Sequence, residues 1–345
     1  MWQLENHTPF PAERCFARSI RGEEIWIVIV QGTFAISADG RIDIADSQSP
    51  VRTTPVYYGS PGQSSLRYDT ELVLQKPATD ILLLGHAHAP AGKAVTRLDV
   101  SLTVGRQTKT LRVTGDRTWR SEPLTTHPTA PIPFMMMPMT YERAFGGGVR
   151  AGSLPDEFDP RNPVGTGRAG TPARAQGMPL PNIEYPGAMI EDWRQRPAPA
   201  GFGPVDRSWQ PRLSRAGTYD DGWSSSRKPL WPEDLQPRFF QSAPDDQCGQ
   251  GLLSGGEPVV LEGLSPQGTL KFQVPKLWFT FRTYFGSRPM EHRAHLETVI
   301  IEPDVPRVIV AWKTTLACHG RDHLLEKTVI GQKTYLPRRG GRLES

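Results

Sequence analysis

Two histidines with the spacing of metal ligands follow an apolar run in the N-terminal half of the chain. His86 and His88 flank Ala87, and Gly85 separates them from the apolar run Ile81–Leu84. On a β-strand, residues two apart point to the same side, so both imidazoles could hold zinc or iron and serve a metal-dependent hydrolase. A lone HxH pair, however, lacks the further ligands of specific zinc motifs. The favoured interpretation is that both rings bond main chain at the end of a buried strand, without a metal.

The other residues that could do chemistry form no recognised catalytic motif. Cys15, Cys248 and Cys318 lie far apart and make no CxxC pair, which indicates free thiols in the reducing cytoplasm rather than a disulfide framework. The acidic pairs at 220–221 and 245–246 could bind a cation or exchange protons, but adjacent aspartates more often cap turns and helices. We therefore predict no catalytic residue, no cofactor and no enzymatic activity.

Composition and charge are those of a folded globular protein. Hydrophobic residues make up 37% and charged residues 22%, and 40 Lys and Arg against 36 Asp and Glu give a net charge of +4. Because the basic residues are scattered, we expect a solvated surface and no nucleic-acid partner. The N-terminus lacks the pattern of a signal peptide. The longest apolar runs, near 25–30 and 307–312, are also shorter than the roughly 20 residues that span a bilayer. We expect a cytoplasmic protein without membrane insertion.

Strands at both ends of the chain must position these residues. In 1–120, apolar and polar residues alternate between short Gly-containing turns, a pattern typical of half-buried strands. Residues 251–345 repeat it, with a hairpin loop at 303–306. The predicted fold class is mainly β, with antiparallel sandwich-like or barrel-like sheets and few short helices. Strands are expected at 25–37, 41–44, 65–68, 71–74, 80–84, 95–104, 111–113, 257–261, 269–274, 276–285, 296–302 and 307–314.

A long irregular segment, 121–250, separates the two strand-rich regions. Positions 121–240 hold 19 of the 34 prolines, and 121–250 holds four of the nine tryptophans. Since aromatic rings need burial, this composition predicts an ordered segment packed on the sheets and not a linker. A short helical stretch is expected at 140–145, followed by a tight loop at Gly146–Gly148. The regions 1–120, 121–250 and 251–345 are expected to pack as one continuous β architecture with the irregular segment laid over it.

Many short phrases agree, in order, with one protein family. They include PGQSSLRYDTELVLQKPATDILLLGHAHAP (61–90), PMTYERAFGGG (138–148), PNIEYP (181–186) and LLSGGEPVVLEGLSP (252–266). In these phrases the chain resembles domain-of-unknown-function family 2169. The resemblance covers about 1–315 and implies one composite domain over that range. The resemblance implies an accessory protein of the bacterial type VI secretion system. Such an adaptor or chaperone would hold a toxic effector and help to load it onto the VgrG-type spike or its PAAR tip.

The resemblance implies a role but no site. We predict the effector-binding face within the irregular segment, because aromatic and arginine side chains are good interface anchors and exposed strand edges can add a partner strand. The segment could instead be an ordered brace between two sheets. Alternative functions are the hydrolase at His86 and His88, and a glycan-binding β module. The candidate contact residues are Tyr185, Trp193, Phe202, Trp209, Arg212, Tyr219 and Trp223.

Overall fold

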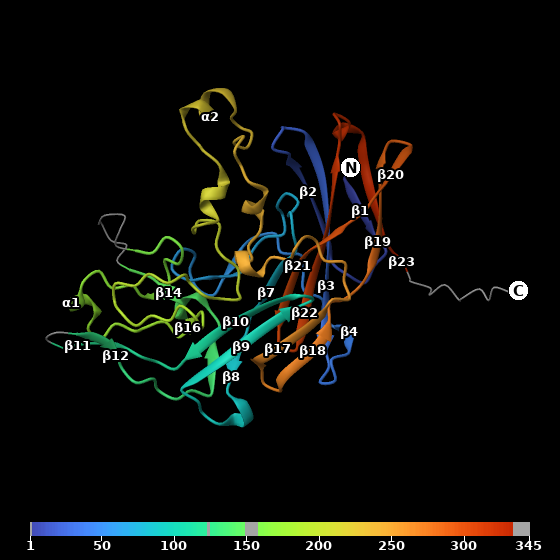
Figure 1. Cartoon of the computed structure of the whole chain (residues 1–345). Helices are drawn as coiled ribbons and strands as arrows, with labels where there is room; N and C mark the ends of the chain where they lie inside the picture. Colours follow the sequence, from blue (N-terminus) through green and yellow to red (C-terminus); the bar gives the residue numbers. More distant parts are fainter. Residues whose placement is uncertain (1, 123–124, 149–157, 334–345) are drawn as a thin grey trace, which may run out of the picture.

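The computed structural model describes residues 2–122, 125–148 and 158–333 (Figure 1). These residues form a mainly β protein, as predicted. The blue N-terminal strands and the red C-terminal strands lie side by side on one side of the molecule, and the green-to-yellow middle of the chain lies on the other (Figure 1). No helix in the described ranges is long and apolar enough to cross a membrane.

A six-stranded sheet forms the centre of the fold. Its order is β2–β3–β22–β21–β7, and β4 pairs with the end of β3 on the edge opposite β22. All neighbours are antiparallel except β21 and β7, which run parallel. The strands are β2 (Ala12–Arg18), β3 (Glu24–Ile36), β4 (Ile42–Ile44), β7 (Asp80–Leu83), β21 (His295–Glu302) and β22 (Arg307–Ala317).

Two further sheets and four strand pairs surround this centre. The five-stranded sheet has the order β16 (Ile183–Glu184), β10 (Gln107–Thr114), β9 (Arg97–Val104), β17 (Pro258–Ser265) and β18 (Gly268–Gln273). The four-stranded sheet has the order β1 (Gln3–Asn6), β23 (Leu325–Lys333), β19 (Trp278–Phe285) and β20 (Arg288–His292). The pairs are β5 (Val56–Tyr57) with β6 (Leu66–Tyr68), β8 (His86–His88) with β13 (Met136–Pro138), β11 (Trp119–Ser121) with β12 (Thr126–Pro128), and β14 (Phe145–Gly146) with β15 (Thr166–Gly167).

Helices in the described ranges are few and short. The α-helices are α1 (Pro172–Ala175) and α2 (Asp221–Ser226). The Asp220 carboxylate accepts the Trp223 N–H at 2.8 Å, so the first acidic pair caps a helix. The helical stretch expected at 140–145 is only one 3₁₀ turn followed by β14. The 3₁₀ turns are η1 (Pro90–Gly92), η2 (Tyr141–Arg143), η4 (Leu213–Ala216), η5 (Pro237–Phe240), η6 (Asp245–Gln247) and η7 (Asp322–Leu324).

The central sheet is buried on both faces. Along β3, Val28 and Val30 pack into the main core that the central sheet shares with the other two large sheets. Ile27 and Ile29 point the other way and pack with Val51 and its neighbours. All four of these β3 side chains are fully buried, at a gain of about 1.5–3 kcal/mol for each. The second face is therefore covered by irregular chain, which places loop residues directly against a rigid sheet.

One predicted strand is wrong. Residues 71–74 alternate like a strand, but they form no ladder. Leu72 and Leu74 pack against the β2–β3 face, whereas Val73 packs on the opposite side with Leu235 and Phe240. The alternation along 71–74 thus arises because the segment packs between two apolar clusters. It does not indicate a hydrogen-bonded neighbouring strand.

Candidate partner-binding groove

The structure distributes the seven predicted contact residues over several places. Phe202, Trp209 and Arg212 are buried, with exposures of 0%, 3% and 3%. Trp193, which is half-buried, packs in a separate cluster with Trp119 and Phe145. The exposed Tyr219 and the half-buried Trp223 form an edge-to-face pair with ring centroids 4.7 Å apart. The half-buried Tyr185 lines a cavity that Arg212 also borders. Phe202 and Trp209 therefore support the fold, whereas Arg212 is buried but borders a cavity.

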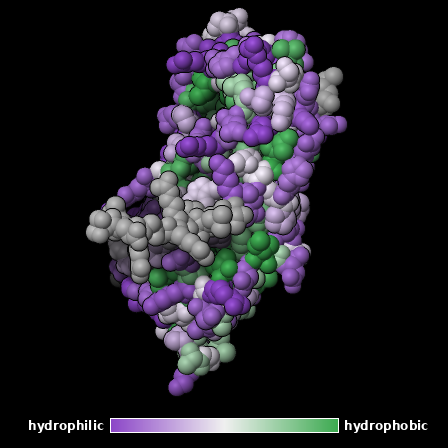
Figure 2. Space-filling view, turned by 90° about the vertical axis from the view of Figure 1, so that its right-hand side faces the viewer, coloured by the Kyte–Doolittle hydropathy of each residue, from purple (hydrophilic) through white to green (hydrophobic). Residues whose placement is uncertain are grey.

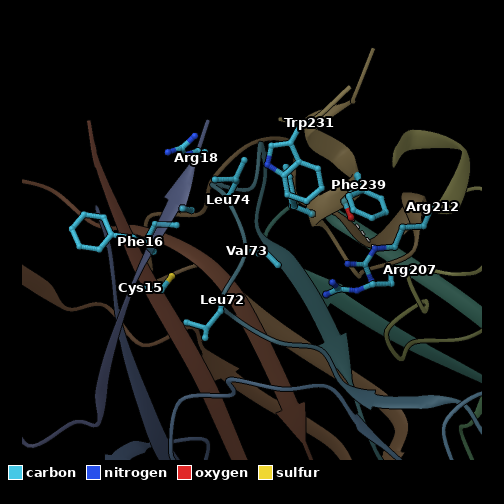
Figure 3. Close-up of a pocket in the computed structure, with 13 residues that line it drawn as sticks. Cys15, Phe16, Arg18, Leu72, Val73, Leu74, Arg207, Arg212, Trp231 and Phe239 are labelled. Atoms are coloured by element: carbon cyan, nitrogen blue, oxygen red, sulfur yellow. Dashed lines mark hydrogen bonds between the residues drawn. The ribbon is translucent and has the colours of Figure 1, made fainter. Parts of the chain in front are cut away.

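A groove of about 330 Å³ lies between the central sheet and the irregular segment (Figure 3). We call it the β2 groove. One wall is residues 15–18 of β2, above Ile27 of β3, and the floor is 72–74. The facing wall is formed by Arg207, Arg212, Trp231, Phe239 and Phe240. Apolar side chains and three arginines make up most of this lining.

Most of this facing wall belongs to an arm, residues 213–240. The arm projects from the body and carries α2 at its tip (Figure 1). Arg227 ties the arm to the β2–β3 turn, because its Nη2 donates to the Ile20 carbonyl at 2.5 Å and its Nε donates to the Trp231 carbonyl at 2.8 Å. Leu230 packs over Gly22 at the same turn. These contacts fix the position of the arm wall relative to β2.

Arg212 anchors the base of the arm. Its guanidinium donates to the carbonyls of Phe239 at 2.9 Å and Val205 at 2.7 Å, and it pairs with the Asp69 carboxylate at 2.7 Å. Arg207 reaches the same carboxylate at 3.0 Å. Burial alone would raise the pKa of Asp69, but the charges of Arg212 and Arg207 outweigh burial and hold that pKa below its usual value. Asp69 is therefore an ionised carboxylate between two arginines.

The β2 strand presents an unpaired edge at the groove. Pro11 accepts the Gln31 N–H, and the Ser19 N–H donates to Glu23, so the odd-numbered residues of β2 exchange bonds with β3. By the antiparallel alternation, Phe16 and Arg18 direct their N–H and C=O groups outward. Among the described residues, no main-chain group bonds to these outward groups. The Phe16 ring points away from the groove (Figure 3) and packs on Trp26 at 4.8 Å, so Phe16 presents its main chain there.

Another face of the molecule offers no comparable apolar surface. The side seen in Figure 2 is mainly hydrophilic, and its hydrophobic side chains form small separate groups outside the grey atoms.

The sequence model of the family described as "Uncharacterized protein conserved in bacteria (DUF2169)" matches residues 21–313. The chain belongs to the DUF2169 family. No curated protein and no solved structure matches it significantly. The match begins within the β2–β3 turn and ends in β22, so it includes the floor of the β2 groove and the whole arm.

A second cavity in this DUF2169 protein, of about 320 Å³, lies between Tyr185, Arg212 and the acidic pair at 245–246. Tyr185 donates to Asp246 at 2.8 Å. The buried Lys109 also binds Asp246 at 2.8 Å, and the Gly201 carbonyl accepts from the same ammonium. Burial lowers the pKa of Lys109. Asp246 thus neutralises a buried ammonium, a structural use other than the turns and caps that the sequence predicted for the acidic pairs.

The two histidines of β8 share one carboxylate. His86 Nδ1 lies 2.7 Å from Oδ2 of Asp304, and His88 Nε2 lies 2.8 Å from Oδ1. Asp304 stands in the hairpin turn between β21 and β22. The rings therefore bond a side chain and not main chain, which corrects that part of the prediction. In the described ranges, no group of three or more His, Cys, Asp and Glu is arranged to hold a metal ion.

Sequence reasoning missed most of the β2 groove. The sequence showed Trp231 and Phe239 as aromatic residues in a Pro-rich segment. No pattern in the neighbouring residues, however, distinguishes an aromatic residue in a groove wall from one in the core. Leu72 and Leu74 gave a strand signal. The edge position of β2 depends on which strand pairs with β3 on its other side, and this partner, β22, comes about 280 residues later in the chain.

Proposed function

We propose that this protein is an adaptor or chaperone of the bacterial type VI secretion system. It acts in the cytoplasm, holds a toxic effector and helps to load it onto the VgrG or PAAR spike. The role comes from the family resemblance of the phrases in 61–90, 138–148 and 252–266. The structural observation that supports it best is the β2 groove, where an unpaired strand edge borders an apolar, arginine-containing cavity.

This groove has the properties that effector holding requires. Main-chain groups on a strand edge recognise a backbone largely independently of its sequence, and pockets beside the edge add selectivity. Arginine and tryptophan side chains such as Arg207 and Trp231 are frequent anchors of protein interfaces. At the tip of the arm, Tyr219 is 50% exposed and rests on Trp223, so it extends the contact surface beyond the groove.

The test is co-purification from a bacterium that encodes this chain and has an active type VI system. The tagged chain should retain an effector together with a VgrG or PAAR protein, identified by mass spectrometry. Tyr219→Ala should reduce effector recovery several-fold with unchanged thermal unfolding. Tyr58→Ala is the matched control, because Tyr58 has a similar exposure of 44% and lines neither the β2 groove nor the cavity at Tyr185. A wild-type chain that retains no secretion protein would contradict the proposal.

A glycan-binding module is the second candidate, favoured by a different cleft. A cavity of about 780 Å³ is lined by Trp278, Phe279 and Trp312 together with polar residues of β20 and β21, and Trp278 is 41% exposed. Aromatic rings at such clefts can stack on the apolar faces of sugars. A glycan array probed with wild-type protein and with Trp278→Ala tests this candidate, which fails if no glycan distinguishes the two.

A further inference from the structure

We propose that the β2 groove binds an extended segment of the partner as an added β-strand. The segment pairs with the outer edge of β2, inserts one apolar side chain into the cavity and places an acidic side chain beside the groove arginines. This inference rests on the proposed function and specifies the chemistry of the partner segment.

The main chain of β2 supplies the first part of the recognition. Phe16 and Arg18 each direct one N–H and one C=O outward, two residues apart, without a main-chain partner among the described residues. An extended backbone has donors and acceptors at the same two-residue repeat. The edge is therefore complementary to a strand and not to a helix, whose own backbone bonds are already made.

The cavity supplies the second part. Cys15 and Ala17 face the same side of the central sheet as Leu72 and Leu74, and Trp231 stands opposite them in the groove lining. Every second side chain of an added strand points to that side. The volume of about 330 Å³ is roughly ten times the share of one water molecule in the liquid. It therefore accommodates an apolar side chain rather than solvent alone.

The charges supply the third part. Three arginines line the groove, at 18, 207 and 212, and no aspartate or glutamate lines it. Arg207 and Arg212 stand on the cavity side and share the single carboxylate of Asp69, and the side chain of Arg207 is 42% exposed. The side chain of Arg18 lies on the same face of β2 as that of Phe16, away from the cavity, so Arg18 contributes its main chain to the groove. An acidic residue on the partner segment, two positions from the apolar one, would lie on the same side and complement this excess of positive charge.

The experiment selects peptides from a phage-displayed library of random twelve-residue sequences on the full-length chain, with counter-selection on Cys15→Trp, whose indole fills the cavity. The enriched peptides should carry an apolar and an acidic residue two positions apart. A fluorescein-labelled consensus peptide should bind saturably in fluorescence anisotropy. N-methylation of its alternate amides, which removes the donors to β2 and keeps every side chain, should weaken binding at least tenfold.

A charge exchange makes the test specific to the groove. Arg207→Glu should weaken the consensus peptide at least tenfold, and replacing the acidic residue of the peptide with lysine should restore most of the loss. Arg14→Glu is the matched control: its side chain has the same exposure of 42% as that of Arg207 but does not line the groove, so binding should change little.

Three results would overturn the inference: no enriched peptide, equal binding of the N-methylated peptide, or equal loss in Arg14→Glu and Arg207→Glu. Co-purification separates this failure from failure of the proposed function. If the folded Arg207→Glu and Cys15→Trp variants still retain the effector, the role stands and the groove is the wrong site. If wild-type chain retains no secretion protein, the role itself is wrong.

Discussion

The arginine pair at Asp69 gives a direct test of whether Arg212 is a contact residue or a structural anchor. The Arg212 side chain is 3% exposed, whereas that of Arg207 is 42% exposed, and both reach the same carboxylate. Replacing Arg212 with alanine leaves Asp69 buried without its closest cation and leaves two carbonyls without their donor. Breaking a buried ion pair on one side typically costs about 3–5 kcal/mol. Arg207→Ala should cost about 0–1 kcal/mol, as expected for an exposed pair.

The assay is urea unfolding followed by tryptophan fluorescence, combined with limited proteolysis of the arm. Arg212→Ala should lower the free energy of unfolding by several kcal/mol and expose 213–240 to cleavage, while Arg207→Ala should match wild type in both. If Arg212→Ala unfolds within about 1 kcal/mol of wild type with an intact arm, the anchoring argument fails. Arg212 would then be free to act as the contact residue that the sequence suggested.

Three further outcomes can be measured. Burial lowers the pKa of His292 from 6.5 to about 4, so the unfolded chain takes up the proton first. The free energy of unfolding should therefore fall by about 3 kcal/mol between pH 6.5 and 4, and urea titrations of His292→Gln should lack this decline. Gly40 has φ +83° and a β18 carbonyl, that of Lys271, where a Cβ would stand, whereas Gly92 has φ +62° and open space there. Gly40→Ala should lower the melting temperature clearly more than Gly92→Ala, whose cost is only about 1–2 kcal/mol. Ellman's reagent should release one equivalent of thionitrobenzoate from native protein, by reaction with Cys15 and not with the buried Cys248 or Cys318, and Cys15→Ser should abolish that release.

The sequence was sufficient to predict strands whose evidence is local. The alternation of Leu98, Val100, Leu102 and Val104 predicted one face of β9, and all but Leu98 are fully buried there. The prolines at 303 and 306 correctly marked the β21–β22 hairpin. The strand prediction at 71–74 failed because alternation indicates on which sides residues pack and does not indicate whether a hydrogen-bonded neighbouring strand exists.

The candidate site could be predicted only in part, because its parts are distant in sequence. Arg212 and Trp223 lie in the segment that the composition singled out, yet one is an internal anchor and the other supports the arm. The edge at Phe16 gave no local signal, because an edge strand and a central strand of similar composition look alike. What makes Phe16 an edge residue is the order of the sheet, and that order is a property of the whole chain.

The pairing of β3 with β22 has a consequence for when the protein can function. The ladder between β3 (24–36) and β22 (307–317) can form only after β22 has been synthesised. Contacts between residues so far apart in sequence are also slow to form. During synthesis, the β2 edge and the arm would be present long before the sheet that holds them in register. A partner segment would therefore meet a complete groove only once nearly the whole chain has been made. A chain shortened before β22 should lose binding and fold together.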